Sequence, residues 1–235
     1  MAETIQRRKL YQEVQDRLME RIQSGEVAPG EQLPSERELM GTYGVGRPAI
    51  REALQTLERA GIVEIAHGER ARVVVPTAQS LIAQIAIGTM HLLRTQPDML
   101  EHLKSARLFL ESGTARMAAE RASDDDVERL RAKVRDQRAA LADRDEFLER
   151  DMAFHREIAQ ITGNPIYPSI VESIFRWASE YYRPMVRAPG AEQLTLAEHE
   201  RIVEALARRD GEGAAQAMHA HLSRANALYG KLIMS

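Results

Sequence analysis

The sequence "SERELMGTYGVGRPAIREALQTLERAG" occupies residues 35–61 and carries the signals of two helices around a turn. Ser35 and Glu38 have the spacing of a capping box, which predicts that a helix begins there. Gly44 predicts the end of that helix, and the Gly-Val-Gly sequence predicts a tight turn. Pro48 lies in the first turn of the next helix, which the last glycine closes. These residues therefore predict a helix-turn-helix.

The flanking residues extend this motif on both sides. Upstream, Leu10, Val14, Leu18 and Ile22 recur at helical spacing, which predicts a first helix. Downstream, "GIVEIAHGERARVVVP" at residues 61–76 has two β-branched runs joined by a His-Gly-Glu turn, which is typical of a hairpin. Three helices and a hairpin predict a winged helix-turn-helix over residues 1–76.

The strand signals end at Pro76, and apolar residues then recur at helical spacing to the end of the chain. Breaker sequences such as "SDDD", "GNP" and "RDGEG" divide this part into six or seven expected helices. We expect a linker and first helix over residues 77–98 and an all-helical domain over residues 99–235. The predicted fold is mainly α.

The composition limits the classes of function. The chain has no cysteine, which excludes disulfides, thiolate metal sites and cysteine nucleophiles. No apolar run approaches the roughly 20 residues of a membrane span, and "MAETIQRRKLYQE" has no apolar core of a signal peptide. Together with the lack of cysteine, which suits a reducing compartment, this leads us to expect a cytoplasmic protein without membrane contact. The net charge is −3, and residues 1–76 contain 11 Lys and Arg against 12 Asp and Glu. Any DNA binding must therefore depend on where charges are placed, not on their number.

Three arginines could read DNA. Arg47 and Arg51 lie four residues apart at the start of the helix that would enter the major groove, where arginine can bond guanine. Arg37, in the first turn of the preceding helix, points toward the same end. The alternative is that these are solvated surface charges, with Arg51 paired to Glu52 or Gln55.

Four polar residues interrupt the apolar helix faces of the second half. Asp151 and His155, in "DMAFH", lie one turn apart on the face that should be apolar. His199 and His221 lie on the apolar faces of two later helices. An unpaired buried polar group costs about 1–3 kcal/mol, so four such groups need partners. A divalent cation would satisfy them together, and a metal-free hydrogen-bonded cluster is the alternative.

Arg107 lies on a core stripe between Leu103 and Leu110, where a buried guanidinium needs an anion. That anion could be Glu111 or another buried acid, in a structural salt bridge, or the carboxylate of a bound effector. Arg183 is a second candidate for effector binding. The sequence offers no general base, nucleophile or phosphate loop beyond the four polar residues, so we expect no enzyme activity.

The sequence "GEQLPSERELMGTYGVGRPAIREALQTLERAGIVE" resembles the DNA-binding domain of GntR-family transcription regulators over about 65 residues. The resemblance implies a homodimer that binds operator DNA with an inverted or direct repeat. It assigns the operator contacts to Arg37, Arg47, Arg51, His67 and Gly68, the last two at the tip of the wing.

The second half resembles the FCD effector domain of the FadR subgroup, through "SARLFLESGTARMAAERA", "DMAFHREIAQITGNPIY" and "EHERIVEALARRDGEGAAQAMHAHL". Members of its metal-binding branch use one Asp and three His at these spacings. The resemblance implies that Asp151, His155, His199 and His221 bind a divalent metal, Zn²⁺ above all, with Ni²⁺, Co²⁺, Fe²⁺ and Mn²⁺ as alternatives. It places the arginine corresponding to Arg107 beside the metal, where it binds the effector.

Within this subgroup the chain resembles repressors that respond to sialic acid. The resemblance implies a repressor of sialic acid catabolism that leaves its operator when N-acetylneuraminate binds. The same carboxylate chemistry suits lactate, gluconate, galactonate and uronates. The metal ion itself is a further alternative as the signal.

Overall fold

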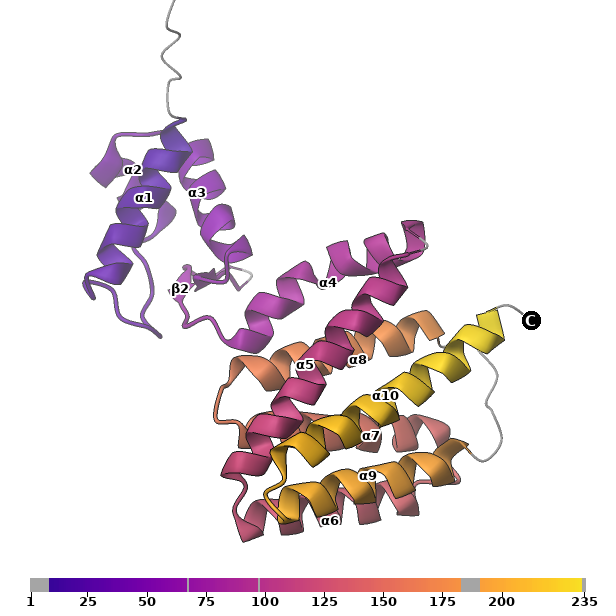
Figure 1. Cartoon of the computed structure of the whole chain (residues 1–235). Coiled ribbons are helices and arrows are strands. Elements are labelled where there is room, and N and C mark those ends of the chain that lie inside the picture. The colour runs from indigo at the N-terminus through magenta and orange to yellow at the C-terminus, as the bar shows by residue number, and fades with distance from the viewer. Residues whose placement is uncertain (1–8, 67, 97, 183–190, 234–235) are drawn as a thin grey trace, which may run out of the picture. The chain divides into compact units, whose positions relative to one another are not determined.

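The computed structural model describes residues 9–66, 68–96, 98–182 and 191–233 (Figure 1). The chain divides into two compact units, Met1–Gln84 and Ile85–Ser235. Helix α4, Ala78–Thr95, begins in the first unit and ends in the second. The boundaries expected at residues 76 and 98 remain predictions.

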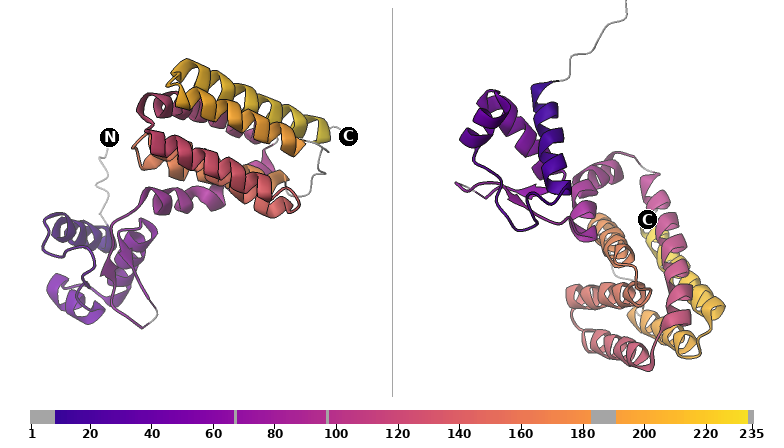
Figure 2. Two further views of the ribbon diagram at one scale, coloured as in Figure 1. Left: turned by 90° about the horizontal axis from the view of Figure 1, so that it is seen from below. Right: turned by 90° about the vertical axis from the view of Figure 1, so that its left-hand side faces the viewer.

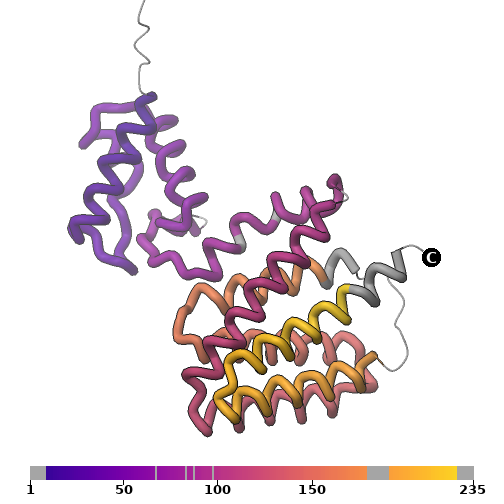
Figure 3. The backbone as a smooth tube through the Cα atoms, viewed as in Figure 1, coloured from indigo at the N-terminus to yellow at the C-terminus, as the bar shows by residue number. Residues whose placement is uncertain are grey.

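The first unit is a winged helix-turn-helix, as the sequence predicts. The strands form one antiparallel pair in which Val63 lies opposite Val73. Figure 3 shows the path of the backbone through these elements. They are α1 Leu10–Gln23, α2 Glu36–Tyr43, α3 Arg47–Arg59, β1 Val63–Glu64 and β2 Arg72–Val73.

Local interactions fix the turn of the helix-turn-helix. The Ser35 hydroxyl accepts from the Glu38 backbone N–H, and the Glu38 carboxylate accepts from the Ser35 N–H at 2.7 Å, so the capping box is complete. Gly44 ends α2 in the left-handed conformation, with φ of 63°. The fully buried Leu39, Ile50 and other apolar residues then pack α2 and α3 onto α1.

The second unit is a helical bundle, shown from two further directions in Figure 2. With α4, the described residues beyond Thr77 form seven helices, as expected. None of the described helices combines the length and apolar character that a membrane span needs. The other six are α5 Met99–Arg121, α6 Asp124–Ala139, α7 Arg144–Ile161, α8 Ile166–Tyr182, α9 Ala191–Ala207 and α10 Gly211–Ile233.

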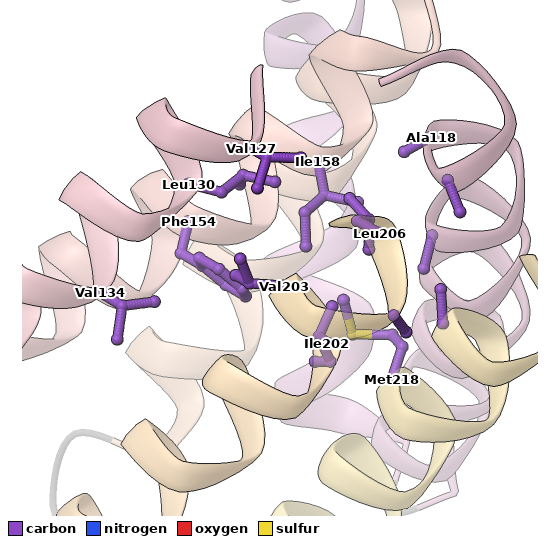
Figure 4. Close-up of a cluster of buried hydrophobic side chains, with 14 of the residues drawn as sticks. Ala118, Val127, Leu130, Val134, Phe154, Ile158, Ile202, Val203, Leu206 and Met218 are labelled. Atoms are coloured by element: carbon purple, nitrogen blue, oxygen red, sulfur yellow. The ribbon is translucent and has the colours of Figure 1, made fainter. Parts of the chain in front are cut away.

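The core of this bundle lies among α5, α6, α7, α9 and α10 (Figure 4). Phe154, Leu130 and Leu206 are fully buried there, and Met218 of α10 faces Ile202 of α9. The alanines of α5, including Ala118, let α10 approach closely. This packing holds α7, α9 and α10, the helices that carry the predicted metal ligands, in fixed relation to one another.

Gly44 provides a test of the turn. We expect Gly44→Ala to lower the free energy of unfolding by about 1–2 kcal/mol, because a side chain disfavours the left-handed conformation. Gly41 is the matched control, since it lies within α2 and a Cβ there would meet open space. Gly41→Ala should stabilise by about 0.5–1 kcal/mol. Urea unfolding followed by circular dichroism measures both, and a shift of the same sign in the two variants would contradict this account.

Candidate functional site

The four predicted ligands meet inside the bundle. Asp151 and His155 come from α7, His199 from α9 and His221 from α10. Their exposed fractions are 9%, 1%, 0% and 3%. One ring nitrogen of each histidine lies within 4.8 Å of the corresponding nitrogen of the other two. Asp151 and His155 lie one turn apart on α7, whereas His199 and His221 come from later helices, so the packing of the bundle brings the three helices' residues together.

The Nε2 atoms face the centre of the cluster. Nε2 of His199 lies 3.4 Å from Nε2 of His221 and 3.5 Å from Oδ1 of Asp151. Nε2 of His155 lies 3.9 Å from Oδ2 of Asp151. This nitrogen is buried and has no hydrogen-bond partner among the residues that the structure describes.

The Nδ1 atoms face outward, each toward a different acceptor. Nδ1 of His155 lies 2.5 Å from Oε2 of Glu111, within ion-pair distance. Nδ1 of His199 lies 2.8 Å from the amide oxygen of Gln137, and Nδ1 of His221 lies 2.8 Å from Oε2 of Glu198. Outer partners of this kind orient histidine ligands around metal ions.

The charges around the cluster keep these acceptors ionised. Burial alone would raise the pKa of Glu111, but Arg107 and His155 outweigh it and lower the pKa to about 2. Burial also acts to raise the pKa of Glu198, while hydrogen bonds from His221 and Arg224 lower it. Both carboxylates are therefore acceptors only, and the facing Nδ1 atoms must carry the hydrogens.

The imidazoles of His199 and His221 are neutral because both are buried. Burial lowers the pKa of His199 well below its usual range. Burial lowers the pKa of His221 as well, against the opposing effect of Glu198. A neutral imidazole with its hydrogen on Nδ1 has a lone pair on Nε2.

A hydrogen-bonded cluster without metal leaves the contact between His199 and His221 unsatisfied. With their hydrogens on Nδ1, these two histidines face each other with the lone pairs of their Nε2 atoms, and two acceptors cannot bond one another. A divalent cation fits at the centre. Zinc bonds of about 2.0–2.1 Å at tetrahedral angles place ligand atoms about 3.4 Å apart. The 3.4 and 3.5 Å separations around His199 match that spacing.

Arg107 lies on α5 beside this cluster, with its side chain 13% exposed. Its Nε donates to Glu111 at 2.6 Å, so Glu111 contacts both Arg107 and His155. The guanidinium carbon lies 4.9 Å from the centre of the Phe175 ring. Arg107 thus forms the salt bridge to Glu111 that the sequence analysis gave as one of its alternatives. Arg183 lies outside the described residues.

The predicted DNA-reading arginines are exposed but not unpaired. Nε of Arg47 lies 2.6 Å from one oxygen of Glu36, and Nε of Arg51 lies 3.1 Å from the other. The hydrogen bond from Arg47 lowers the pKa of Glu36. Arg51 therefore pairs with Glu36 of α2 and not with Glu52 or Gln55, the local partners that the alternative named.

The other predicted contacts lie on the same unit. Arg37 is exposed in the first turn of α2. Gly68, in the turn between the strands, has φ of 79°, a conformation that suits glycine at a hairpin tip. His67 lies outside the described residues.

Sequence reasoning missed Gln137, Glu198 and Glu36. Gln137 continues the buried line of Val127, Leu130 and Val134 on α6, and a polar residue on such a line is the signal that could have found it. Glu198 precedes His199 directly, and nothing in its spacing indicates the contact with His221. Glu36 adjoins Arg37 in the second helix, and only the packing of α2 on α3 brings it to its partners.

Comparisons with known proteins agree with the two units. Residues 10–73 match the family described as "Bacterial regulatory proteins, gntR family", and residues 102–224 match the FCD domain. The HTH-type transcriptional repressor NanR of Cronobacter sakazakii is 40% identical, over 92% of this chain and 84% of that protein. The NanR of an Enterobacter species is 39% identical, over 95% of this chain and 86% of that protein.

Solved structures also resemble this chain. The Streptococcus agalactiae GntR has a TM-score of 0.69 at 27% identity, covering 91% of this chain and 97% of that one. The E. coli protein McbR/YncC, at 17% identity and a TM-score of 0.53, covers 96% of this chain and 99% of its own and shares the fold. The chain therefore belongs to the gntR family of bacterial regulators, as a DNA-binding transcriptional repressor with an FCD domain and not as an enzyme.

Proposed function

We propose that the chain is a homodimeric repressor that leaves its operator when a sugar acid, N-acetylneuraminate, binds beside a metal ion in the helical bundle. The observation that carries the proposal is the buried group of three histidines whose ring nitrogens lie within 4.8 Å of one another. The Asp151 carboxylate lies 3.5 Å from Nε2 of His199. The similarity to NanR repressors over more than nine tenths of the chain supports sialic acid as the effector. A repressor of this kind acts in the cytoplasm, where operator DNA is found.

Asp151, His155, His199 and His221 would hold the ion. A donor set of three imidazoles and one carboxylate suits Zn²⁺ best and is compatible with Ni²⁺, Co²⁺, Fe²⁺ and Mn²⁺. When bound, the ion supplies a Lewis acid that attracts a carboxylate. Gln137 and Glu198 would hold the imidazoles of His199 and His221 with their lone pairs inward. Glu111 contacts the third imidazole, that of His155.

Arg107 would bind the carboxylate of the effector, and Arg183 is a further proposed contact. The guanidinium of Arg107 has Glu111 on one side and the Phe175 ring at 4.9 Å. An incoming carboxylate would compete with Glu111 for the same donors. Glu111 also contacts His155, a proposed metal ligand on α7. Effector binding at Arg107 would therefore change the contact between Glu111 and His155. This chain of contacts would be a physical route from the effector to the bundle.

Operator binding would use Arg37, Arg47, Arg51, His67 and Gly68. DNA would replace Glu36 as the partner of Arg47 and Arg51, since the start of α3 is the part of a recognition helix that contacts base edges. Two copies of the winged unit would bind two half-sites of an inverted repeat, or of a direct repeat. Lowering DNA affinity 100-fold needs only about 2.7 kcal/mol of coupling to the effector.

Two alternatives concern the signal only. Lactate, gluconate, galactonate and uronates also carry a carboxylate that could meet the metal and Arg107. In the second alternative, the metal ion itself is the signal. Arg107 supports an organic acid, because its guanidinium lies beside the site and could pair with the carboxylate of an effector as it pairs with Glu111.

Thermal stability tests the effector. Zinc-loaded protein with N-acetylneuraminate at 100 times its dissociation constant should gain about 2.7 kcal/mol, and a chelator should abolish the gain. We expect Arg107→Gln to lose stabilisation by the acid and to keep stabilisation by Zn²⁺. Arg201→Gln, exposed on α9, should keep both. If another acid from a panel stabilised the protein and N-acetylneuraminate did not, that acid would replace N-acetylneuraminate as the proposed effector. Release of the operator by the metal ion alone would favour the metal as the signal.

Operator binding tests the arginines. We expect Arg47→Ala and Arg51→Ala each to weaken binding to the operator by about 1–3 kcal/mol at fixed salt, because each would remove a contact to a base. Arg59→Ala, at the opposite end of α3, is the control and should change affinity little. A gel shift or fluorescence anisotropy measures all three. Unchanged affinity in the first two variants would remove them from the DNA interface.

A further inference from the structure

Gln137 is the one fully buried glutamine among the described residues, and it comes from a helix that supplies no predicted ligand. It extends the buried line of α6 formed by Val127, Leu130 and Val134. Its side-chain Nε2 donates to Oδ1 of Asp151 at 2.8 Å. Its Oε1 lies 2.8 Å from Nδ1 of His199. One amide thus contacts two of the four residues of the cluster.

Only one arrangement of hydrogens satisfies these two contacts. The amide NH₂ of Gln137 faces Asp151, and its amide oxygen faces His199. That oxygen can only accept, so Nδ1 of His199 must carry the hydrogen. Nε2 of His199 is then a bare lone pair, facing His221 and Asp151. The Asp151 carboxylate has no other side-chain hydrogen bond among the described residues.

We propose that Gln137 is a positioning residue that selects the metal-binding tautomer of His199 and holds the Asp151 carboxylate beside it. This inference rests on the metal site of the proposed function. The amide spans α7 and α9, so it also fixes the distance between the ligands of two helices. Losing an outer partner of a metal ligand costs typically about 10–100-fold in metal affinity.

The test uses Gln137→Met, which keeps the length of the side chain and removes both hydrogen bonds. We expect its dissociation constant for Zn²⁺, measured by competition with a chromogenic chelator, to rise about 10–100-fold. The matched control is Gln193→Met, an exposed position on α9, with an unchanged constant. Should the methionine variant not fold, Gln137→Asn keeps a polar group too short to reach both partners. It should also lose Zn²⁺ affinity, by several-fold or more.

A second readout needs no metal. In long-range ¹H–¹⁵N spectra of metal-free wild-type protein, His199 should carry its hydrogen on Nδ1. In Gln137→Met and Gln137→Asn, the form with the hydrogen on Nε2 should become populated, which a merely space-filling role would not produce. If the variants kept wild-type Zn²⁺ affinity and the tautomer of His199 did not change, the role of Gln137 would be overturned and the proposed metal site would stand. If wild-type protein bound no Zn²⁺, the proposed metal site would fall as well.

Discussion

The bundle depends on one constraint, that a polar group taken out of water must find a partner. Three imidazoles are buried among α7, α9 and α10, and each has an acceptor on its outer side. Because a neutral imidazole has one donor and one acceptor, satisfying the outer nitrogen determines what the inner nitrogen offers. The arrangement of Glu111, Gln137 and Glu198 therefore defines the chemistry of the centre. Apolar packing places the rings, and these three residues orient them.

In the winged unit the constraint is the opposite one, because charged side chains must stay exposed and still be held in a fixed orientation. Its charges nearly cancel over residues 1–76, so attraction to DNA depends on a local arrangement. Glu36 binds both Arg47 and Arg51 and is itself 29% exposed. A paired arginine samples fewer conformations than a solvated one, so the two guanidinium groups are already gathered at the start of α3. Phosphates and base edges offer the same kind of acceptor that Glu36 provides.

Much of this was predictable because it is local in sequence. The caps at Ser35 and Gly44 set the ends of α2, and the polar residues on apolar faces indicated Asp151 and the histidines. The partners that complete each site were not predictable, since they depend on how helices pack. Gln137 and His199 are separated by 62 positions, and Arg51 and Glu36 by 15. Periodicity reports which side of a helix faces inward and contains no information on which residue lies opposite.

The absence of cysteine gives the buried cluster a further significance. His199 and His221, 22 positions apart, lie on two helices joined by a short turn, and His155 adds a third helix from earlier in the chain. An ion held by all three would connect these segments as a covalent bridge does, closing loops that an unfolded chain would leave open. A protein that cannot form a disulfide would then have a reversible cross-link in a reducing environment. Its strength would follow the supply of metal in the cell.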